Sequence, residues 1–567
     1  MFLDANQFAL NTLLVAIALA AASVLVFERT SPRAALRLGV ARVLSACALL
    51  AVFAWTNFGG LQTVFVDRPG VRDGAAGRAK VETHLPFHFH EFFHYYLGAK
   101  YFRELGYGGL YDCTGLADAE IAEEDGVPRK IGGYIRNLDD VLRDRPYDAA
   151  LAHCRDEFRP NFSDPRWASF KNDQRALRRL VPDDWWGGAV FDAGFNPPPS
   201  WCVVGSAFAN AIPIRVAGLP TYLVATSLDM VLALACFLVL RRHFGRAPAA
   251  MAAIFFGANF VAAYGWNGGA FLRYTWVTAV VFGLTYAKRE RWLLAGVFFA
   301  CAACDRIFPA AFGVGAAIPL AVRALRSTPA RRDLGRLAMG AGATVVGLVL
   351  VSTALFGAAS WGTFFSRILA HGDVYYVMHI GLKKVLTFRD WVPQQNFHAH
   401  AGLERFHDWN MRLHETWAVS RAIALPLQLF ALGGAVFASL RRKPHEAGLL
   451  LGITAMFFFS LPANYYYVVA ALIPAFLLRA AVTAPTRERR LWEYAVLVGF
   501  VVMWLCTLLA SRMWGDDIVY NHFICQAVLV FLIGWIGVWA MLGASMPGAL
   551  PWRALKPAEG AKGAPSS

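Results

Sequence analysis

The chain carries few charged residues for its length. Of its 567 residues, 16% are charged and 57% are hydrophobic, whereas soluble globular proteins carry about 25% charged residues. No segment resembles an ATP-binding loop or a soluble nucleotide-sugar domain. The shortage of charge argues against a soluble enzyme and favours a protein that lies largely within a membrane.

Cysteine is also scarce, and the nine cysteines do not form a disulfide framework. Six fall in apolar segments, where we expect small buried residues: Cys47, Cys236, Cys301, Cys304, Cys506 and Cys525. Because the Cys301-x-x-Cys304 pair lies in an apolar helix, we do not interpret it as a redox or zinc motif. In the first long polar segment, Cys113 and Cys154 can form one disulfide if that side of the membrane is oxidising. An odd thiol, Cys202, would remain.

Apolar windows long enough for membrane helices recur along the chain, since a span needs about 17 to 25 apolar residues. We therefore predict an all-α polytopic membrane protein with about thirteen transmembrane helices. Residues 198–217 are apolar but broken by prolines, so we predict a re-entrant or interfacial helix there. The predicted spans lie near 8–27, 38–57, 219–240, 247–264, 271–287, 291–304, 306–324, 335–357, 419–440, 446–461, 465–481, 491–511 and 517–542.

Basic residues form short runs between the apolar segments, and the net charge is +15. This pattern predicts cytoplasmic loops rather than a nucleic-acid surface. The runs are Arg33 with Arg37, Arg241-Arg242, Lys288-Arg289, Arg331-Arg332, Arg441-Arg442-Lys443, and Arg487 with Arg489-Arg490. We expect no nucleic-acid partner and a multi-pass location in a bacterial inner membrane.

The spans divide the chain into six parts. Two of these are polar and predicted to lie on the external, periplasmic side, the first of them with interfacial helices. The parts are two spans at 1–57, the first external loop at 58–197, a membrane bundle with the re-entrant segment at 198–357, the second external loop at 358–418, the last spans at 419–545, and a disordered cytoplasmic tail at 546–567.

The most informative segment runs from His84 to Tyr107 and is rich in histidine and aromatic residues. Its centre reads His90-Glu91-Phe92-Phe93-His94, the H-E-x-x-H pattern of zinc peptidases. In that interpretation His90 and His94 bind a metal from one helix face, and Glu91 polarises the metal-bound water. The third ligand would come from one of the later histidines: His398, His400, His407 or His414.

A second interpretation follows from a helix over 87–105. Such a helix places Glu91, Tyr95, Gly98 and Phe102 on one face. Its aromatic surface predicts a helix lying at the membrane interface, and the glycines from Gly106 onward end it. Glu91 would then lie at headgroup height beside a cavity that lipids can enter.

Four short segments resemble a known family, the GT-C superfamily of membrane glycosyltransferases. The most similar branch is the polyprenyl-phosphate-mannose-dependent mannosyltransferases, glycosyltransferase family 87. Its first-loop pattern has an acidic residue, Tyr-Tyr four and five residues later, a glycine turn and Leu-Tyr-Asp. The similar segments are Glu91–Gly106 with Leu110-Tyr111-Asp112, Phe195-Asn-Pro197-Pro198, Asp305-Arg306-Ile-Phe308-Pro309, and Leu461–Tyr467 with Pro474.

The resemblance implies a fold and a chemistry. The fold would be a GT-C-like bundle with a large first external loop. Glu91, where the family usually has Asp, would act as general base on an acceptor hydroxyl. That hydroxyl would displace polyprenyl phosphate from a donor sugar with inversion. The donor would carry mannose or another hexose or pentose, and the acceptor would be a lipid or glycan of the cell envelope. Residues 113–194 would be an insertion in the first loop.

The departing phosphate needs cationic or hydrogen-bonding groups near it. We expect them among His90, His94, Tyr95, Tyr96, Lys383, Lys384, Arg389, Arg306, His398 and His400, with Arg273 and His371 as further candidates. Asp305 and Arg306 lie at the turn between two apolar segments and should face a cavity or each other. Asp67 is a second possible carboxylate near the mouth of the site, but an ordinary turn residue before Arg68-Pro69-Gly70 explains it better.

Two alternatives stay open from the sequence. The zinc peptidase requires His90, His94 and a third ligand to converge. A lipid or solute carrier is the other, although such proteins show broken helices in paired halves and this chain has one proline-broken segment without a partner. No cofactor is firmly implied, and a divalent metal ion is compatible with the glycosyltransferase.

Overall fold

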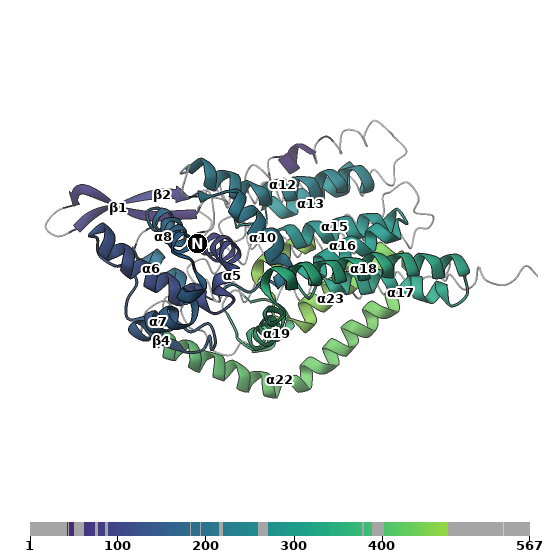
Figure 1. Ribbon diagram of the computed structural model, residues 1–567. Coiled ribbons are helices and arrows are strands. Elements are labelled where there is room, and N and C mark those ends of the chain that lie inside the picture. The colour runs from purple at the N-terminus through teal and green to yellow at the C-terminus, as the bar shows by residue number, and fades with distance from the viewer. Residues whose placement is uncertain are drawn as a thin grey trace, which may run out of the picture.

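A computed structural model shows a mainly helical protein (Figure 1), which confirms the predicted helical class. Apolar helices pack side by side on one side of the molecule, and a lobe of short helices and hairpins covers one end of them. The described residues are 42, 45–49, 51, 62–73, 77–85, 89–181, 183–192, 194–214, 219–258, 270–376, 379–387, 402–440, 442–473, 534 and 537. The predicted spans at 8–27 and 491–511 and the predicted tail lie outside this set, as do most residues of the span at 38–57 and all but two residues of the span at 517–542.

The lobe is built from the first predicted external loop. It begins with an antiparallel hairpin of β1 (Gln62–Asp73) and β2 (Gly77–Leu85), in which Gln62 pairs with Leu85. The other elements of the lobe are α3 (Phe89–Phe92), η2 (Phe93–Leu97), α4 (Gly98–Lys100), α5 (Phe102–Leu105), α6 (Gly109–Asp125), β3 (Tyr134–Arg136), β4 (Asp144–Pro146), α7 (Tyr147–His153), η3 (Cys154–Phe158), η4 (Arg159–Asn161), α8 (Asp164–Arg178), α9 (Asp183–Gly188) and η5 (Ala189–Phe191).

A disulfide joins Cys113 in α6 to Cys154 at the start of η3, which confirms the pairing that the sequence allows. The residues immediately before the two cysteines also meet, because His153 Nδ1 lies 2.7 Å from a carboxylate oxygen of Asp112. Arg145 pairs with the same carboxylate. The covalent link and the buried polar cluster together fix α6 against α7.

The remaining elements follow in chain order and form the apolar part. They are α10 (Pro199–Ala211), α12 (Leu219–Phe244), α13 (Arg246–Ala258), α15 (Thr275–Lys288), α16 (Trp292–Asp305), α17 (Ala310–Ala324), α18 (Thr328–Phe356), α19 (Ala359–His371), α20 (Leu382–Thr387), α22 (Gly402–Ser439), α23 (Pro444–Phe459) and η7 (Asn464–Leu472). The predicted re-entrant segment is α10, which with 13 residues is shorter than the roughly 20 residues that a span needs. The second predicted external loop ends inside α22, so one helix runs from that loop into the predicted span at 419–440.

Three helices in the described part are long and apolar enough to cross a membrane: Val224–Phe244, Thr328–Phe356 and Phe406–Ser439. The prediction of about thirteen spans is therefore wrong for the residues that the structure describes. Four further apolar helices have only 10–17 residues. Most side chains of one of them, α23, are buried by neighbouring helices. Such short apolar segments are typical of helices inside a protein core, which explains why hydropathy alone counted them as spans.

The four basic runs that fall in the described part of the chain, at 241–242, 288–289, 331–332 and 442–443, lie at the helix ends that point away from the lobe (Figure 1). Lys288, at the end of α15, donates a hydrogen bond to the backbone carbonyl of His243 near the end of α12. The ring of Phe244 lies 6.2 Å from that of His445 at the start of α23. At the other end, α15 begins, α16 ends and α17 begins next to the lobe. The two ends of the apolar part thus differ: arginine and lysine lie at one end, and the lobe lies at the other.

Candidate functional site

The helical segment that carries Glu91 runs from Phe89 to Leu105 and contains one wide turn. Residues Phe93–Leu97 form a π-helix, an irregularity that is frequent at functional sites. Gly106, with φ +52°, ends the segment, as the glycine pattern predicts. Its aromatic side chains are buried and pack against the rest of the lobe and α10. The position of the segment relative to a membrane stays a prediction.

One face of this segment packs against Phe195. The ring of Phe195 lies 6.2 Å from that of Tyr95 and 5.7 Å from that of Phe102. Between them, Gly98 has no side chain, and a Cβ atom there would lie 2.5 Å from the Phe195 ring. The close approach therefore requires glycine at position 98. It brings two of the segments that resemble the glycosyltransferase family, Glu91–Gly106 and Phe195–Pro198, into direct contact. We call the four segments with this resemblance the family-like segments.

Glu91 forms an ion pair with Arg273. A carboxylate oxygen of Glu91 lies 2.5 Å from Nη2 of Arg273, whose side chain is fully buried, whereas that of Glu91 is 23% exposed. The Arg273 guanidinium also lies over the ring of Tyr465, 4.2 Å from its centre. A buried arginine needs such a partner, since an isolated buried charge is strongly unfavourable. The carboxylate of Glu91 is thus held at the boundary between the buried helices and solvent.

Arg306 forms the second cationic centre of the site. Its Nη2 donates to the Tyr95 hydroxyl at 2.7 Å and its Nε to the Tyr466 hydroxyl at 3.2 Å. Nη1 contacts the carboxylate of the neighbouring Asp305 at 3.2 Å, so the acid and the base face each other as predicted. Burial raises the pKa of Tyr95 to about 12, which keeps this hydroxyl protonated while it accepts from Arg306.

These contacts bring together four segments that are far apart in the sequence. Beyond the pairs above, the Tyr107 hydroxyl donates to the carbonyl of Pro197 at 2.8 Å. The ring of Phe308 lies 4.6 Å from that of Tyr466. All four family-like segments therefore meet around Glu91, Arg273 and Arg306. We call this group, with Tyr95, Tyr465 and Tyr466, the Glu91 site.

The two histidines of the H-E-x-x-H pattern contact other residues of the lobe. The Nε2 atom of His94 is 2.7 Å from the Tyr111 hydroxyl and 3.1 Å from the carbonyl of Ala189. His94 Nδ1 is 3.7 Å from Asp192. Across the described ranges, no three His, Cys, Asp or Glu side chains lie close enough to hold one metal ion. His94 therefore contributes to the packing of η2 against α6. Because two predicted third ligands, His398 and His400, are not among the described residues, the zinc interpretation stays a prediction.

Several other predicted site residues are not part of the Glu91 site in the structure, or lie outside the described residues. The Tyr96 hydroxyl donates to the carbonyls of Ala209 and Ile212, so it anchors the end of α10 and does not face the Glu91 site. His90 is half-buried at the start of the segment, with its Nε2 near Gly188. Arg389, His398 and His400 lie outside the described residues, as does the side chain of Asp67.

Lys383 and Lys384 lie on α20, which is tied to the late family-like segment. Just before α20, His379 forms a β-bridge with Ala463 and the Ile380 amide donates to the Pro462 carbonyl at 2.8 Å. Lys384 is buried with its Nζ atom 4.2 Å from the centre of the Trp409 ring, and burial lowers its pKa to about 7. Lys383 lies 3.5 Å from Asp373.

His371 lies on α19, the helix that precedes this part of the chain. Desolvation lowers its pKa to about 4. His371 is therefore mainly neutral at pH 7 in the absence of a bound anion.

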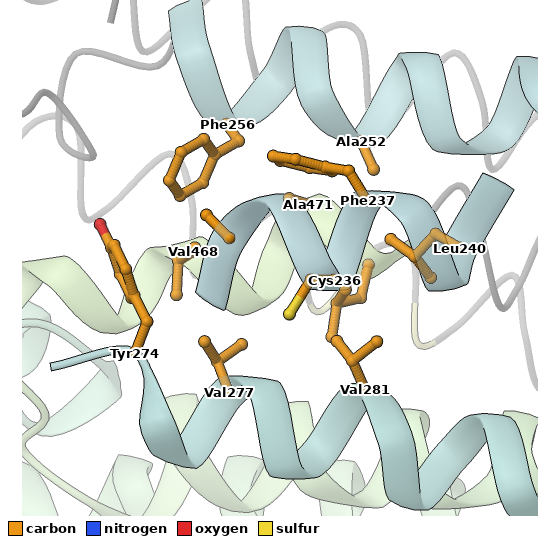
Figure 2. A pocket seen from close by; sticks show the side chains of 12 residues that line it. Cys236, Phe237, Leu240, Ala252, Phe256, Tyr274, Val277, Val281, Val468 and Ala471 are labelled. Atoms are coloured by element: carbon orange, nitrogen blue, oxygen red, sulfur yellow. The ribbon is translucent and has the colours of Figure 1, made fainter. Parts of the chain in front are cut away.

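An apolar crevice begins next to the Glu91 site. It lies between α12, α13, α15 and η7, and Figure 2 shows its aliphatic and aromatic walls. Tyr274, the residue after Arg273, is part of the lining. The other lining residues are Ala233, Cys236, Phe237, Leu240, Ala252, Phe256, Val277, Val281, Val468, Ala471 and Leu472. A charged centre and an apolar crevice are therefore adjacent in this fold.

Two charged residues near this centre carry more weight in the structure than in the sequence patterns above: Arg273, a further candidate there, and Asp229, which none of those patterns includes. Both fall within predicted apolar spans, where an ionisable side chain is expensive and marks a functional or paired position. That signal was present in the sequence and would have singled out both.

Comparison of the chain with protein-family models, curated proteins and solved structures yields no match.

Proposed function

We propose that the protein is an integral-membrane glycosyltransferase that moves a sugar from a polyprenyl-phosphate donor to a lipid or glycan acceptor. The observation that carries the proposal is the convergence of the four family-like segments on Glu91, Arg273 and Arg306. Arg306 donates hydrogen bonds to Tyr466, which lies 160 positions later in the sequence, and to Tyr95, which lies 211 positions earlier. Segments that resemble one family only by chance have no reason to meet in space around a carboxylate and two arginines.

Glu91 is the proposed general base. Its ion pair with Arg273 holds the carboxylate in place, and its partial exposure leaves room for an acceptor hydroxyl. The acceptor oxygen attacks the anomeric carbon while its proton passes to Glu91. The bond from the anomeric carbon to the phosphate oxygen breaks, and its electron pair leaves with polyprenyl phosphate. A base positioned in this way contributes about 10²–10⁴-fold in rate.

Arg306 and Arg273 are the proposed partners of the phosphate. Arginine presents planar pairs of N–H donors that match phosphate oxygens, and fixed donors near a departing anion stabilise the transition state. Lys384 is a further candidate, because binding of an anion beside a lysine with a pKa of about 7 would favour its protonated form. Tyr95 and Tyr466 hold Arg306 in place for this role.

The apolar crevice beside Arg273 is too small for the lipid part of the donor. Its volume is about 30 Å³, whereas a cavity that binds one benzene molecule measures about 150 Å³. The isoprenoid chain would therefore lie along the apolar helix surfaces in the membrane, with its phosphate near the arginines.

The proposed orientation follows from the two ends of the apolar part. The basic turns face the cytoplasm, since cytoplasmic loops are enriched in Lys and Arg. The lobe and the Glu91 site then face the periplasm, where the Cys113–Cys154 disulfide is stable. The three span-length helices anchor this arrangement in the bacterial inner membrane.

The test is a transfer assay with purified protein in detergent. Wild type is incubated with radiolabelled polyprenyl-phosphate mannose and with an extract of envelope lipids as acceptor, and labelled glycolipid is quantified. We expect incorporation by wild type and by Glu123→Gln, which alters an exposed glutamate of α6, and loss with Glu91→Gln. Equal incorporation by Glu91→Gln would remove Glu91 from the mechanism. Peptide cleavage that is lost on chelation would favour the zinc peptidase instead.

A further inference from the structure

A buried carboxylate, Asp229, lies behind the Glu91 site and has no role in the mechanism above. It is fully buried in α12, within one of the three span-length helices. An aspartate in such a position is costly unless other groups compensate it. One of its oxygens, Oδ1, accepts a hydrogen bond of 3.0 Å from the backbone amide of Tyr274. The other, Oδ2, has no hydrogen-bond partner in the described part of the chain.

The turn that Asp229 contacts has an unfavourable backbone. Leu272 has φ +55°, a left-handed conformation that is uncommon for residues other than glycine. Holding such a residue costs on the order of 1–3 kcal/mol, so the surrounding structure must enforce it. Leu272 directly precedes Arg273, and Tyr274 directly follows it. The strained turn is therefore the element that directs the Arg273 guanidinium toward Glu91.

Two kinds of contact hold this turn from its sides. On the lobe side, the ring of Phe271 lies 6.2 Å from that of Phe92 and 5.4 Å from that of Tyr96. On the α12 side, the Asp229 carboxylate bonds to the Tyr274 amide and attracts the positive charge of Arg273. Aromatic contacts restrict the turn broadly, whereas the hydrogen bond fixes one backbone atom next to Arg273.

We propose that Asp229 is a positioning residue: it holds the 270–274 turn so that Arg273 pairs with Glu91. The inference rests on the proposed function, because it assigns Asp229 to the same site. Asp229 contacts no reacting group and acts only through Arg273. A misplacement of about 1 Å in such a site can reduce the rate by about 10²-fold. The position of the carboxylate oxygen that accepts from the Tyr274 amide matters more than the charge, which adds only attraction to Arg273.

Three substitutions separate position from charge. Asp229→Ala removes the hydrogen bond, Asp229→Asn keeps an oxygen acceptor at the same place without charge, and Asp229→Glu keeps the charge but moves it by one methylene. In the transfer assay we expect kcat to fall by about 10- to 100-fold in Asp229→Ala and in Asp229→Glu. We expect the kcat of Asp229→Asn to exceed that of Asp229→Ala by at least about tenfold. Thr226→Ala, one turn earlier on α12, controls for general disturbance of the helix.

A double-mutant cycle with Arg273→Gln provides the readout that a merely structural role would not change. If Asp229 acts through Arg273, then Asp229→Ala reduces kcat no further once Arg273 is already replaced. Additive losses in the cycle would overturn the proposal, as would an Asp229→Asn variant no better than Asp229→Ala. If Asp229→Ala does not fold, as judged by gel filtration and thermal unfolding, Asp229→Glu takes its place in the cycle.

The failure of this inference can be distinguished from failure of the proposed function. Full activity of all Asp229 variants, with loss in Glu91→Gln, would refute the positioning role and leave the glycosyltransferase intact. Full activity of Glu91→Gln would refute the proposed function itself.

Discussion

Arg306 donates a hydrogen bond of 2.7 Å to the hydroxyl of Tyr95, although 211 positions separate the two residues in the sequence. The bond joins the turn between α16 and α17 to the π-helical part of the segment that carries Glu91. Nε of the same guanidinium bonds to Tyr466. The chemistry proposed for the Glu91 site therefore depends on a single arginine that joins its own turn to two distant parts of the chain.

Arg306→Lys should impair transfer more than it impairs folding. Lysine keeps the charge but cannot reach Tyr95, Tyr466 and a phosphate with fixed planar donors. We expect kcat/KM for the donor to fall by about 10²-fold, which corresponds to roughly 2.7 kcal/mol of transition-state stabilisation. Steady-state transfer kinetics and thermal unfolding in the same detergent measure the two effects. An activity loss no larger than the loss of folded protein would assign Arg306 to structure alone.

Gly98→Ala should destabilise the protein through the Phe195 contact. The new methyl group would collide with a ring that is itself enclosed by Tyr95, Phe102 and Tyr107. Overpacking of this kind costs about 1–3 kcal/mol, and the displaced ring should also disturb Tyr95. The matched control is Gly347→Ala in α18, where open space surrounds the new Cβ and alanine favours the helix. Thermal unfolding compares the two, and equal effects would contradict the packing account.

Replacing both Cys113 and Cys154 with serine should lower the stability of the lobe. The disulfide closes a loop with a sequence separation of 41, for which chain entropy predicts about 2–4 kcal/mol. Because α6 also positions Tyr111 against His94, activity should fall with it. Thermal unfolding of the double variant, and of wild type with and without reductant, measures the effect. If reductant destabilises the double variant as much as wild type, the stabilisation does not come from this disulfide.

Lys384→Met should stabilise the protein in a pH-dependent manner. Burial lowers the pKa of Lys384 to about 7, whereas an unfolded lysine titrates near 10.4. Between these values the unfolded chain binds more protons than the folded one, so wild-type stability rises with pH across this window. The loss of folding stability caused by burying the protonated lysine reaches its full value below about pH 7 and amounts to at most about 5 kcal/mol.

The advantage of Lys384→Met should therefore be largest at pH 6 and disappear toward pH 10, reduced by the lost contacts to Tyr376 and Trp409. Lys443→Met, at an exposed position, is the control. Thermal unfolding at pH 6, 8 and 10 measures both variants. A constant difference across this range would show that the buried lysine is not the cause.

The sequence predicted the helical class, the disulfide, the Asp305–Arg306 contact and the positions of most helices. It overestimated the number of spans, because burial by neighbouring helices and burial by lipid select the same apolar residues. Helices such as α16 and α23 are shorter than a membrane span, and their length and their packing against neighbouring helices become visible only in the fold. The pairing of Glu91 with Arg273 was equally inaccessible, because it depends on a strained turn at Leu272 that no local pattern encodes. Gly98, in contrast, was on the predicted face, but its partner Phe195 could be found only in the fold.

The most direct test separates donor binding from transfer in Glu91→Gln. Binding of a radiolabelled polyprenyl-phosphate sugar is measured by equilibrium filtration, and single-turnover transfer is followed with the same preparation. The account predicts a dissociation constant within about threefold of wild type together with a transfer rate reduced by about 10²–10⁴-fold. A wild-type transfer rate in Glu91→Gln would contradict the central claim that this carboxylate removes the acceptor proton.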